Sequence, residues 1–124
     1  MSRIDEAKEL LEALQARVPD INDLAIARTN GLIIYTLRKI ASDTRSERML
    51  GGMASALFSI SKRAADELMK GNFKSLNVEI DSGTIFLIYT GKVILIALTK
   101  QEPNLGLLSL ELEESAAKLN DIFA

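Results

Sequence analysis

Residues 44–71, TRSERMLGGMASALFSISKRAADELMKG, carry the signals of one long helix with a defined start and end. Thr44 and Glu47 have the T-x-x-E spacing of a capping box, in which each side chain satisfies a free backbone N–H of the first turn. Gly71 stands where a residue in the left-handed conformation would end the helix. The stretch therefore predicts a helix over residues 45–70.

Two stripes of apolar side chains run along this predicted helix, at spacings of three and four residues. A helix on the surface of a domain needs one such stripe, which faces its own core. In a chain of 124 residues a second stripe requires a second surface, so we expect another copy of the protein or a different partner to cover it. The first stripe comprises Met49, Met53, Leu57, Ile60, Ala64 and Leu68, and the second comprises Leu50, Ala54, Phe58, Ala65 and Met69.

The composition describes one globular domain, residues 1–124, and excludes several kinds of chemistry. Apolar residues make up 48% of the chain and charged residues 26%, as in ordinary globular proteins. The net charge of -2 argues against nonspecific binding of nucleic acid, which requires a basic surface. The chain has no His, Cys or Trp, which rules out disulfides, cysteine-based metal sites and the Ser-His-Asp and Cys-His catalytic groups. We therefore expect a protein that is not an enzyme and that uses no metal or cofactor.

No segment of the sequence is typical of a secreted or membrane-inserted protein. The chain starts with polar and charged residues, MSRIDE, rather than with the apolar run of a signal peptide. The most apolar stretch, residues 85–98, is interrupted by Thr90-Gly91-Lys92, so neither half approaches the roughly 20 residues of a membrane helix. We expect a cytoplasmic protein without membrane insertion.

Helical and strand patterns precede the long helix. Residues 3–17 have the apolar period of a helix, which a proline two residues later ends. Two β-rich runs, 24–28 and 32–36, are separated by a turn that contains Asn30-Gly31. Asn-Gly is a strong hairpin signal because both residues tolerate positive φ. A polar loop at Lys39–Asp43 then leads into the long helix.

Three more predicted strands and a last helix follow. Leu76, Val78 and Ile80 alternate with polar residues, which predicts a strand with one buried face. Residues 84–89 and 93–98 are almost continuously apolar, so these strands should be buried on both faces. The last helix starts after Pro103-Asn104, and its apolar stripe comprises Leu108, Leu112, Ala116, Leu119 and Phe123.

The order of elements is helix, two strands, helix, three strands, helix, which indicates an α+β fold. The turns within each group of strands are too short for parallel crossovers, so the strands should be antiparallel. We expect an α/β sandwich in which the long central helix covers one face of a five-stranded antiparallel sheet. The two terminal helices should cover the other face.

Taken in order, these segments resemble the Roadblock/LC7 family over nearly the whole chain. The run NGLIIY is similar to the second strand of the family, and GMASAL resembles the alanine-rich part of its central helix. Each piece is ordinary by itself, and the likeness lies in their order and spacing. The segments concerned are 18–19, 20–28, 30–35, 52–57, 76–79, 83–87 and 104–106.

The resemblance implies a profilin-like Roadblock fold and a homodimer or heterodimer with one continuous sheet and paired central helices. It also implies a platform that binds and regulates Ras-like small GTPases. Members of the family serve dynein, in which they are light chains, as well as lysosomal complexes and bacterial polarity or motility systems. A single-domain chain such as this one resembles the stand-alone prokaryotic regulators.

The residues favour a dimer independently of the resemblance. Residues 74–80 should form an edge of the sheet, because the two strands that follow have the composition of central strands. An exposed edge strand readily pairs with another chain, and pairing with its own copy would bring the two central helices together. The predicted dimer interface comprises Met53, Leu57, Ile60, Ala64, Leu76, Val78 and Ile80.

Arg45, Arg48 and Met49, at the start of the long helix, are the candidates for contact with a GTPase. An arginine finger supplied in trans would accelerate hydrolysis strongly, but the resemblance supplies no such motif. A solvated or ion-paired arginine is the ordinary interpretation, and core or dimer packing is the ordinary interpretation of the methionine.

Two other functions fit the same sequence. One is a structural scaffold subunit of a larger complex without a GTPase partner. The other is a profilin-like or PAS-like sensor of a small ligand, which would need an internal pocket with a few polar groups. The apolar residues 84–98 indicate a filled interior and favour the interaction module.

Overall fold

The computed structural model describes residues 1–38 and 44–124. The polar loop predicted at Lys39–Asp43 lies outside the described residues, as do the side chains of Arg38 and of Thr44, one half of the predicted capping box. The elements are α1 (Arg3–Arg17), β1 (Ile21–Ala27), β2 (Ile33–Arg38), α2 (Thr44–Ala64), η1 (Ala65–Met69), β3 (Ser75–Ile80), β4 (Gly83–Tyr89), β5 (Ile94–Thr99) and α3 (Leu105–Ile122).

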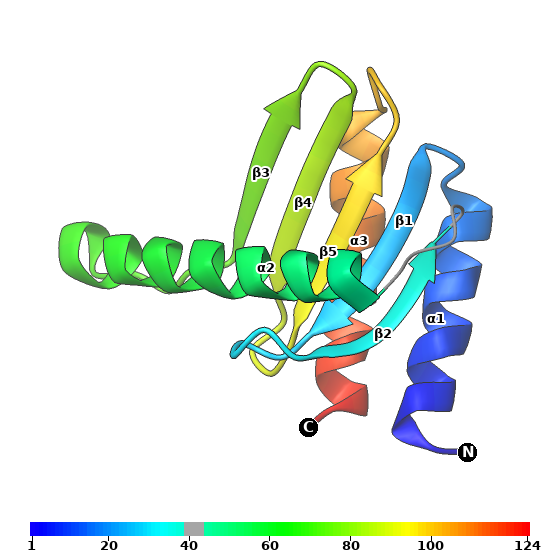
Figure 1. The fold of residues 1–124 in the computed structure, drawn as a ribbon, viewed down its shortest axis with the longest axis horizontal. Coiled ribbons are helices and arrows are strands. Elements are labelled where there is room, and N and C mark those ends of the chain that lie inside the picture. The colour runs from blue at the N-terminus through cyan, green and yellow to red at the C-terminus, as the bar shows by residue number, and fades with distance from the viewer. Residues whose placement is uncertain (39–43) are drawn as a thin grey trace.

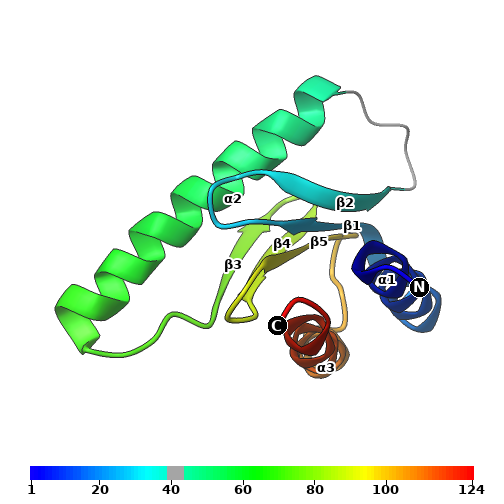
Figure 2. The ribbon, with the colours of Figure 1, turned by 90° about the horizontal axis from the view of Figure 1, so that it is seen from below.

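The five strands form one antiparallel sheet in the order β2-β1-β5-β4-β3. The pairing of β1 with β5 joins the N-terminal hairpin to the three C-terminal strands, and β2 and β3 form the two edges. α2 lies across one face of the sheet, and α1 and α3 lie on the other (Figure 1, Figure 2). The predicted fold class and the predicted edge position of β3 are confirmed.

Each face of the sheet has its own hydrophobic core. β4 and β5 send alternate side chains into both cores, which explains their continuously apolar sequences and confirms their predicted burial on both faces. The core under α1 and α3 includes Leu11, Leu14, Leu24, Ile26, Phe86, Leu95, Leu108, Leu112 and Leu119. The core under α2 includes Ala25, Ala27, Ala54, Phe58, Leu87, Ile94 and Ile96.

The β1–β2 hairpin turns at the predicted residues but with a different geometry. The amide of Gly31 donates to the carbonyl of Arg28 at 2.9 Å, and Gly31 has a φ of 95°. The expectation that Asn30 would also take a positive φ is wrong. Its side-chain oxygen instead accepts a hydrogen bond from the amide of Leu32 at 3.1 Å. Because the register shifts at the end of β1, the turn is of the kind that a glycine bulge closes.

The starts of α1 and α3 are capped by side chains. Ser2 and Asp5 form a reciprocal capping box, in which the Ser2 hydroxyl accepts from the Asp5 amide at 3.1 Å and the Asp5 carboxylate from the Ser2 amide at 3.2 Å. Asn104 accepts from the amide of Leu107 at 3.1 Å, so the helix start predicted at Pro103-Asn104 is confirmed. Each cap satisfies amides that the first turn leaves without a helical partner.

Helical structure continues from α2 through η1 to Met69, one residue before the predicted end at Lys70. After Ala64 the chain makes a π-helical turn, η1, and Lys70 rather than Gly71 takes the left-handed conformation, with a φ of 51°. The amide of Gly71 turns back to the carbonyl of Ala65 at 3.2 Å. A hydrogen bond of this kind requires the left-handed residue to stand directly before Gly71, which is why the predicted position was wrong.

Asp20 ties the start of β1 to the loop that precedes α3. Its carboxylate accepts from the backbone amide of Asn104 at 2.8 Å and lies 3.4 Å from the ammonium group of Lys100. The hydrogen bond from Asn104, with a smaller contribution from Lys100, lowers the pKa of Asp20 below its ordinary value, although partial burial opposes the shift. This carboxylate therefore stabilises the folded chain in its charged form.

Candidate functional site

α2 presents its two stripes to two different environments. Ala54 and Phe58 of the second stripe are buried against the sheet, and Leu50 is half-buried. Met53 and Ile60 of the first stripe are 52% and 66% exposed. The helix thus covers the sheet with one stripe and leaves most of the other without cover from the described residues.

The four α2 residues predicted to lie in a dimer interface share this first stripe. Met53, Ile60 and Ala64 are exposed. Leu57 differs, because it is half-buried and packs against the core under α2. Three of the four side chains are therefore available to a partner, and the fourth borders them.

The C-terminal end of the long helix projects beyond the sheet. Figure 1 shows α2 crossing the strands and continuing past the edge strand β3. Leu68 and Met69, both in η1, are 79% and 80% exposed. In the described part of the chain, no strand lies beneath this end of the helix. We call residues 62–69 the overhang. Its two large apolar side chains are exposed, whereas Lys62 and Asp66 line a hollow with Tyr89 and Gly91 at the edge of the sheet.

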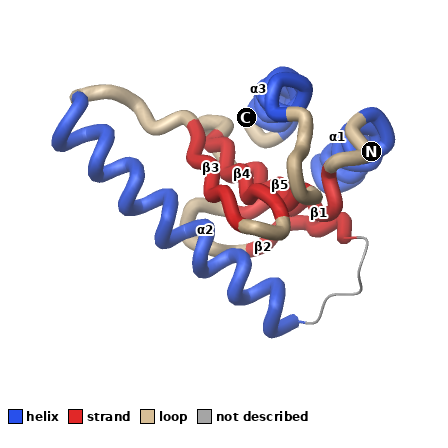
Figure 3. The backbone as a smooth tube through the Cα atoms, turned by 90° about the horizontal axis from the view of Figure 1, so that it is seen from above, coloured by secondary structure: helices blue, strands red, loops and turns tan. Residues whose placement is uncertain are grey.

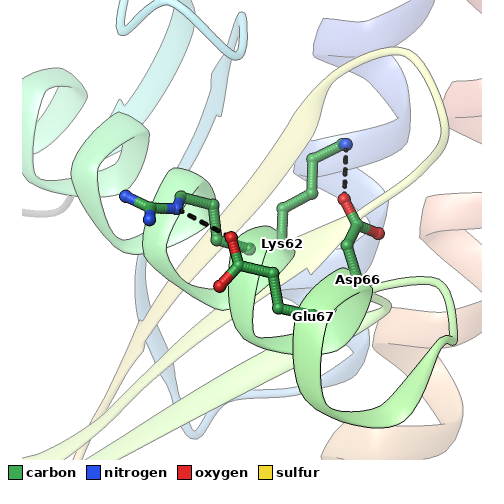
Figure 4. Close-up of polar contacts among 4 residues, drawn as sticks. Lys62, Asp66 and Glu67 are labelled. Carbon is green, nitrogen blue, oxygen red and sulfur yellow. Dashed lines mark hydrogen bonds and ion pairs between the residues drawn. The ribbon is translucent and has the colours of Figure 1, made fainter.

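The overhang carries ion pairs along its own surface. Lys62 lies 3.1 Å from Asp66, and Arg63 lies 3.7 Å from Glu67, each pair one helical turn apart (Figure 4). All four side chains are more than half exposed. Exposed pairs of this kind contribute about 0.3–0.5 kcal/mol each to a helix. They therefore stabilise the overhang only weakly.

β3 is an edge strand whose apolar face is only partly covered. Leu76 and Val78 are half-buried, and Ile80 is 51% exposed. The prediction of one buried face is therefore correct for the start of β3 and wrong for its end. The reason is that α2 crosses the sheet near the start of β3 and leaves the far end bare (Figure 1).

A hollow of about 550 Å³ lies at this bare end of the sheet. Its apolar lining comes from Ile80, Ile85 and Leu98, which occupy neighbouring strands. Ile85 and Leu98 are half-buried and pack against the edge of the core under α2. The same face of the sheet thus carries a packed half under α2 and an uncovered apolar half beside it.

The first turns of α2 bring together the residues predicted to contact a GTPase. Arg45, Arg48 and Met49 are all exposed, and their spacing of three and four residues places them on adjacent turns. Glu47 lies beside them and accepts a hydrogen bond from the Thr36 hydroxyl of β2 at 3.3 Å. The arrangement offers two guanidinium groups and a flexible thioether to a partner.

Aromatic side chains fill the space between α2 and the C-terminal strands. The ring of Phe58 lies 4.8 Å from that of Tyr89 and 5.8 Å from that of Phe73. Tyr89 also donates from its hydroxyl to the carbonyl of Gly91 at 3.1 Å. Sequence reasoning missed Phe73, because its isolated position after the helix carries no periodic signal. This packing gives α2 a fixed position on the sheet.

The described residues contain neither a cluster of metal ligands nor a helix fit to span a membrane. Within residues 1–38 and 44–124, no three metal-binding side chains of the Asp, Glu, His or Cys type converge. Among the helices of the same residues, none combines the length and apolar character needed to cross a membrane.

Comparisons with known proteins give the chain its relatives. The sequence profile described as Roadblock/LC7 domain matches residues 7–100. A protein of Methanocaldococcus jannaschii, itself uncharacterised, is 32% identical over 75 residues, which cover 60% of this chain and 66% of the relative. The chain thus spans slightly less than two thirds of that relative's length.

Two solved structures share the fold. A Roadblock/LC7 domain from Streptomyces avermitilis aligns with a TM-score of 0.80 at 23% identity, covering 90% of this chain and 92% of that one. The gliding protein MglB from Thermus thermophilus aligns with a TM-score of 0.87 at 13% identity, covering 99% and 92%. At such identities the likeness concerns the fold alone.

Proposed function

We propose, from the premise that this chain belongs to the Roadblock/LC7 family, that it is a homodimeric interaction module that binds and regulates a Ras-like small GTPase. Family membership supports the class of partner. One observation supports the dimer above all others. An edge strand with an incompletely covered apolar face lies directly beside a helix end that overhangs the sheet.

In the proposed dimer, β3 of one chain pairs antiparallel with β3 of the other around a twofold axis perpendicular to the sheet. The pairing satisfies the backbone groups on the open side of both edge strands and joins the two sheets into one. It also places the start of each β3 beside the end of the other β3, because antiparallel strands run in opposite directions.

This arrangement gives each overhang a surface to pack against, at the end of the partner's β3. α2 leaves the sheet across the start of β3, so the twofold axis brings the partner's overhang over the other end of β3. That end carries Ile80 beside the bare hollow. Leu68 and Met69 of one chain would then cover the apolar residues that the other chain leaves exposed. Full burial of such side chains contributes about 1.5–3 kcal/mol each.

The start of α2 stays accessible in this arrangement, because it lies at the opposite end of the helix from the overhang. We propose that Arg45, Arg48 and Met49 form the contact with the GTPase, since methionine adapts well to a partner surface. The module would act by binding one nucleotide state of the GTPase more tightly than the other. We place this complex in the cytoplasm.

Sedimentation velocity tests the dimer. Leu76→Lys combined with Val78→Lys places two charges on the apolar face of β3 and should convert the dimer to a monomer. The matched control, Ile4→Lys combined with Leu110→Lys, makes the same change at exposed apolar residues of α1 and α3 and should leave the dimer intact. Dimers of equal stability in both variants would rule out pairing through β3.

Binding to Ras-like GTPases from the same genome tests the partner. The wild-type chain should form a complex with one of them that depends on whether GDP or a GTP analogue is bound. Arg45→Glu with Arg48→Glu should weaken the complex, whereas Lys8→Glu with Lys118→Glu, the same charge change on α1 and α3, should not. A dimer that binds none of these GTPases would instead point to the scaffold function.

A further inference from the structure

Among the described residues, no helix covers the edge strand β3 on the face of the sheet that carries α1 and α3. Figure 2 and Figure 3 show α1 and α3 side by side on this face, with α1 near β1 and β2 and α3 near β4 and β5. The Arg17 guanidinium of α1 and the Glu111 carboxylate of α3 are 3.1 Å apart, so these two helices are direct neighbours. On this face α1 and α3 thus cover β2, β1, β5 and β4, and β3 has no described helix over it.

β3 directs polar side chains to this uncovered position. Ser75 and Asn77 are paired with Ile88 and Phe86 of β4, which both contribute to the core under α1 and α3. Glu79 follows in the same row of side chains. The face is therefore apolar across the central strands and becomes polar at the edge strand.

A groove runs between β3 and α3. It consists of two hollows, of about 470 and 570 Å³, that share Asn77 as a lining residue. The first extends along α3 past Ser109 and Glu113, and the second extends to Leu105 at the start of α3. Leu105 is 53% exposed, so the groove offers apolar as well as polar contacts.

The charged residues that line this groove are predominantly acidic. The lining contains four exposed carboxylates and one exposed lysine, which favours a cationic occupant. The acidic residues are Glu79, Asp81, Glu102 and Glu113, and the lysine is Lys74.

In the proposed dimer, the grooves of the two chains would combine into one that is about as wide as one helix. β3 and its copy would lie side by side between the α3 helices of the two chains. Two strands spaced about 4.8 Å apart occupy about 10 Å, which is the diameter of one helix. The rest of this face has the same proportion of one helix to two strands.

We propose that the two grooves of a dimer form a single slot that binds one amphipathic helix of a partner protein, with Lys or Arg side chains toward Glu79 and Glu113 and apolar side chains toward Leu105. The inference rests on the proposed dimer through β3, but it does not depend on the GTPase. Because the slot lies on the twofold axis, it holds one helix per dimer, in either of two equivalent directions.

A synthetic peptide of about 14 residues, about 21 Å long as a helix, serves as the probe. It consists of Ala, Leu and Lys, with its lysines on one helical face, and a scrambled peptide of the same composition is the control. Fluorescence anisotropy at about 0.15 M salt measures affinity, since weak surface attraction is screened there. Native mass spectrometry counts the peptides bound per dimer. We expect tighter binding of the amphipathic peptide and one copy for every two chains.

Charge-reversal variants locate the binding site. Glu79→Lys with Glu113→Lys should weaken binding by at least about tenfold, since two favourable charge contacts become repulsive. Glu12→Lys with Glu114→Lys, the same change on exposed positions outside the groove, should have a much smaller effect. Glu102→Lys with Glu113→Lys avoids β3 altogether, so any loss of binding that it causes is not a loss of strand pairing.

The outcomes separate the slot from the dimer on which it rests. A wild-type chain that sediments as a monomer would overturn both proposals. A dimer that binds two peptides, or binds the scrambled peptide equally well, would overturn the slot alone. The slot would also be wrong if NMR shifts of the bound protein moved in α1 or α2 rather than in residues 75–79 and 105–116.

Discussion

The carbonyl oxygen of Gly31, in the β1–β2 turn, lies against the backbone of Gly51 in α2, with no space for a side chain between them. The same contact includes a hydrogen bond of 2.7 Å from the Ser55 hydroxyl to the carbonyl of Thr29. The hairpin turn is thereby attached to the middle of α2. This attachment fixes where the helix crosses the sheet and thus how far its end overhangs.

Replacing Gly51 by Ala should therefore destabilise the fold. A methyl group at this position would overlap with the Gly31 carbonyl, and forcing atoms into a close-packed contact costs about 1–3 kcal/mol. Alanine favours a helix interior over glycine by about 1 kcal/mol, so the loss would be larger without that gain. Urea unfolding at fixed protein concentration measures the change in the free energy of unfolding.

Gly52→Ala is the matched control for this prediction. Gly52 is the next residue of the same helix, and a methyl group there would meet no atom within 4 Å. We expect it to stabilise the fold by about 0.5–1 kcal/mol through helix propensity alone. If Gly51→Ala stabilised the fold as Gly52→Ala is expected to, the close approach of the two backbones would not be important for folding.

Replacing Ser115 by Ala should stabilise the fold. Its side chain is buried in α3, and its hydroxyl has no hydrogen-bond partner within the described part of the chain. A buried polar group without a partner costs about 1–3 kcal/mol, so Ser115→Ala should raise the free energy of unfolding by about 1 kcal/mol. Thermal or urea unfolding measures the change. A clear loss of stability would show that the hydroxyl does have a partner in the folded protein.

Much of this fold could be predicted from the sequence, because its signals are local. The alternation of Leu76 and Val78 with polar residues indicated β3, and the apolar period of α3 indicated the four leucine and alanine positions that are buried. The T-x-x-E spacing and the asparagine cap marked helix starts close to their observed positions. Periodicity and caps act within a few residues, so sequence alone can show them.

The remaining features depend on contacts between distant residues. The close approach of Gly31 and Gly51 links positions twenty residues apart, and no local pattern distinguishes Gly51 from Gly52. Leu68 and Met69 are visibly apolar in the sequence. That no described strand lies beneath them follows only from the way in which α2 crosses the sheet. The sequence therefore showed that Leu68 and Met69 are apolar, but not where they lie relative to the sheet.

Asp20→Asn should reduce stability in a pH-dependent way. Folding lowers the pKa of Asp20 from its ordinary value of 3.8, so folding favours the charged form. The stability that it contributes is present above about pH 3.8 and is lost as the pH falls through the lower pKa of the folded state. The difference in unfolding free energy between wild type and Asp20→Asn should therefore be larger at pH 7 than at pH 2.

Lys100→Met separates the two causes of this shift. It removes the ammonium group but keeps the hydrogen bond from the Asn104 amide, which is the larger cause. The variant should retain most of the pH dependence that Asp20→Asn removes. Equal effects of the two substitutions would mean that the ion pair with Lys100, rather than the backbone amide, holds the carboxylate in its charged form.

The overhang offers the cleanest test of the proposed dimer, because its apolar side chains contribute little to the chain's own core. Leu68→Lys with Met69→Lys changes two residues that are largely exposed in the single chain, so the secondary structure by circular dichroism should be unchanged. Each dimer would lose four apolar side chains from its interface, and we expect its dissociation constant to rise by at least about a hundredfold. Sedimentation equilibrium measures this constant. An unchanged constant would mean that the overhang does not contact the second chain.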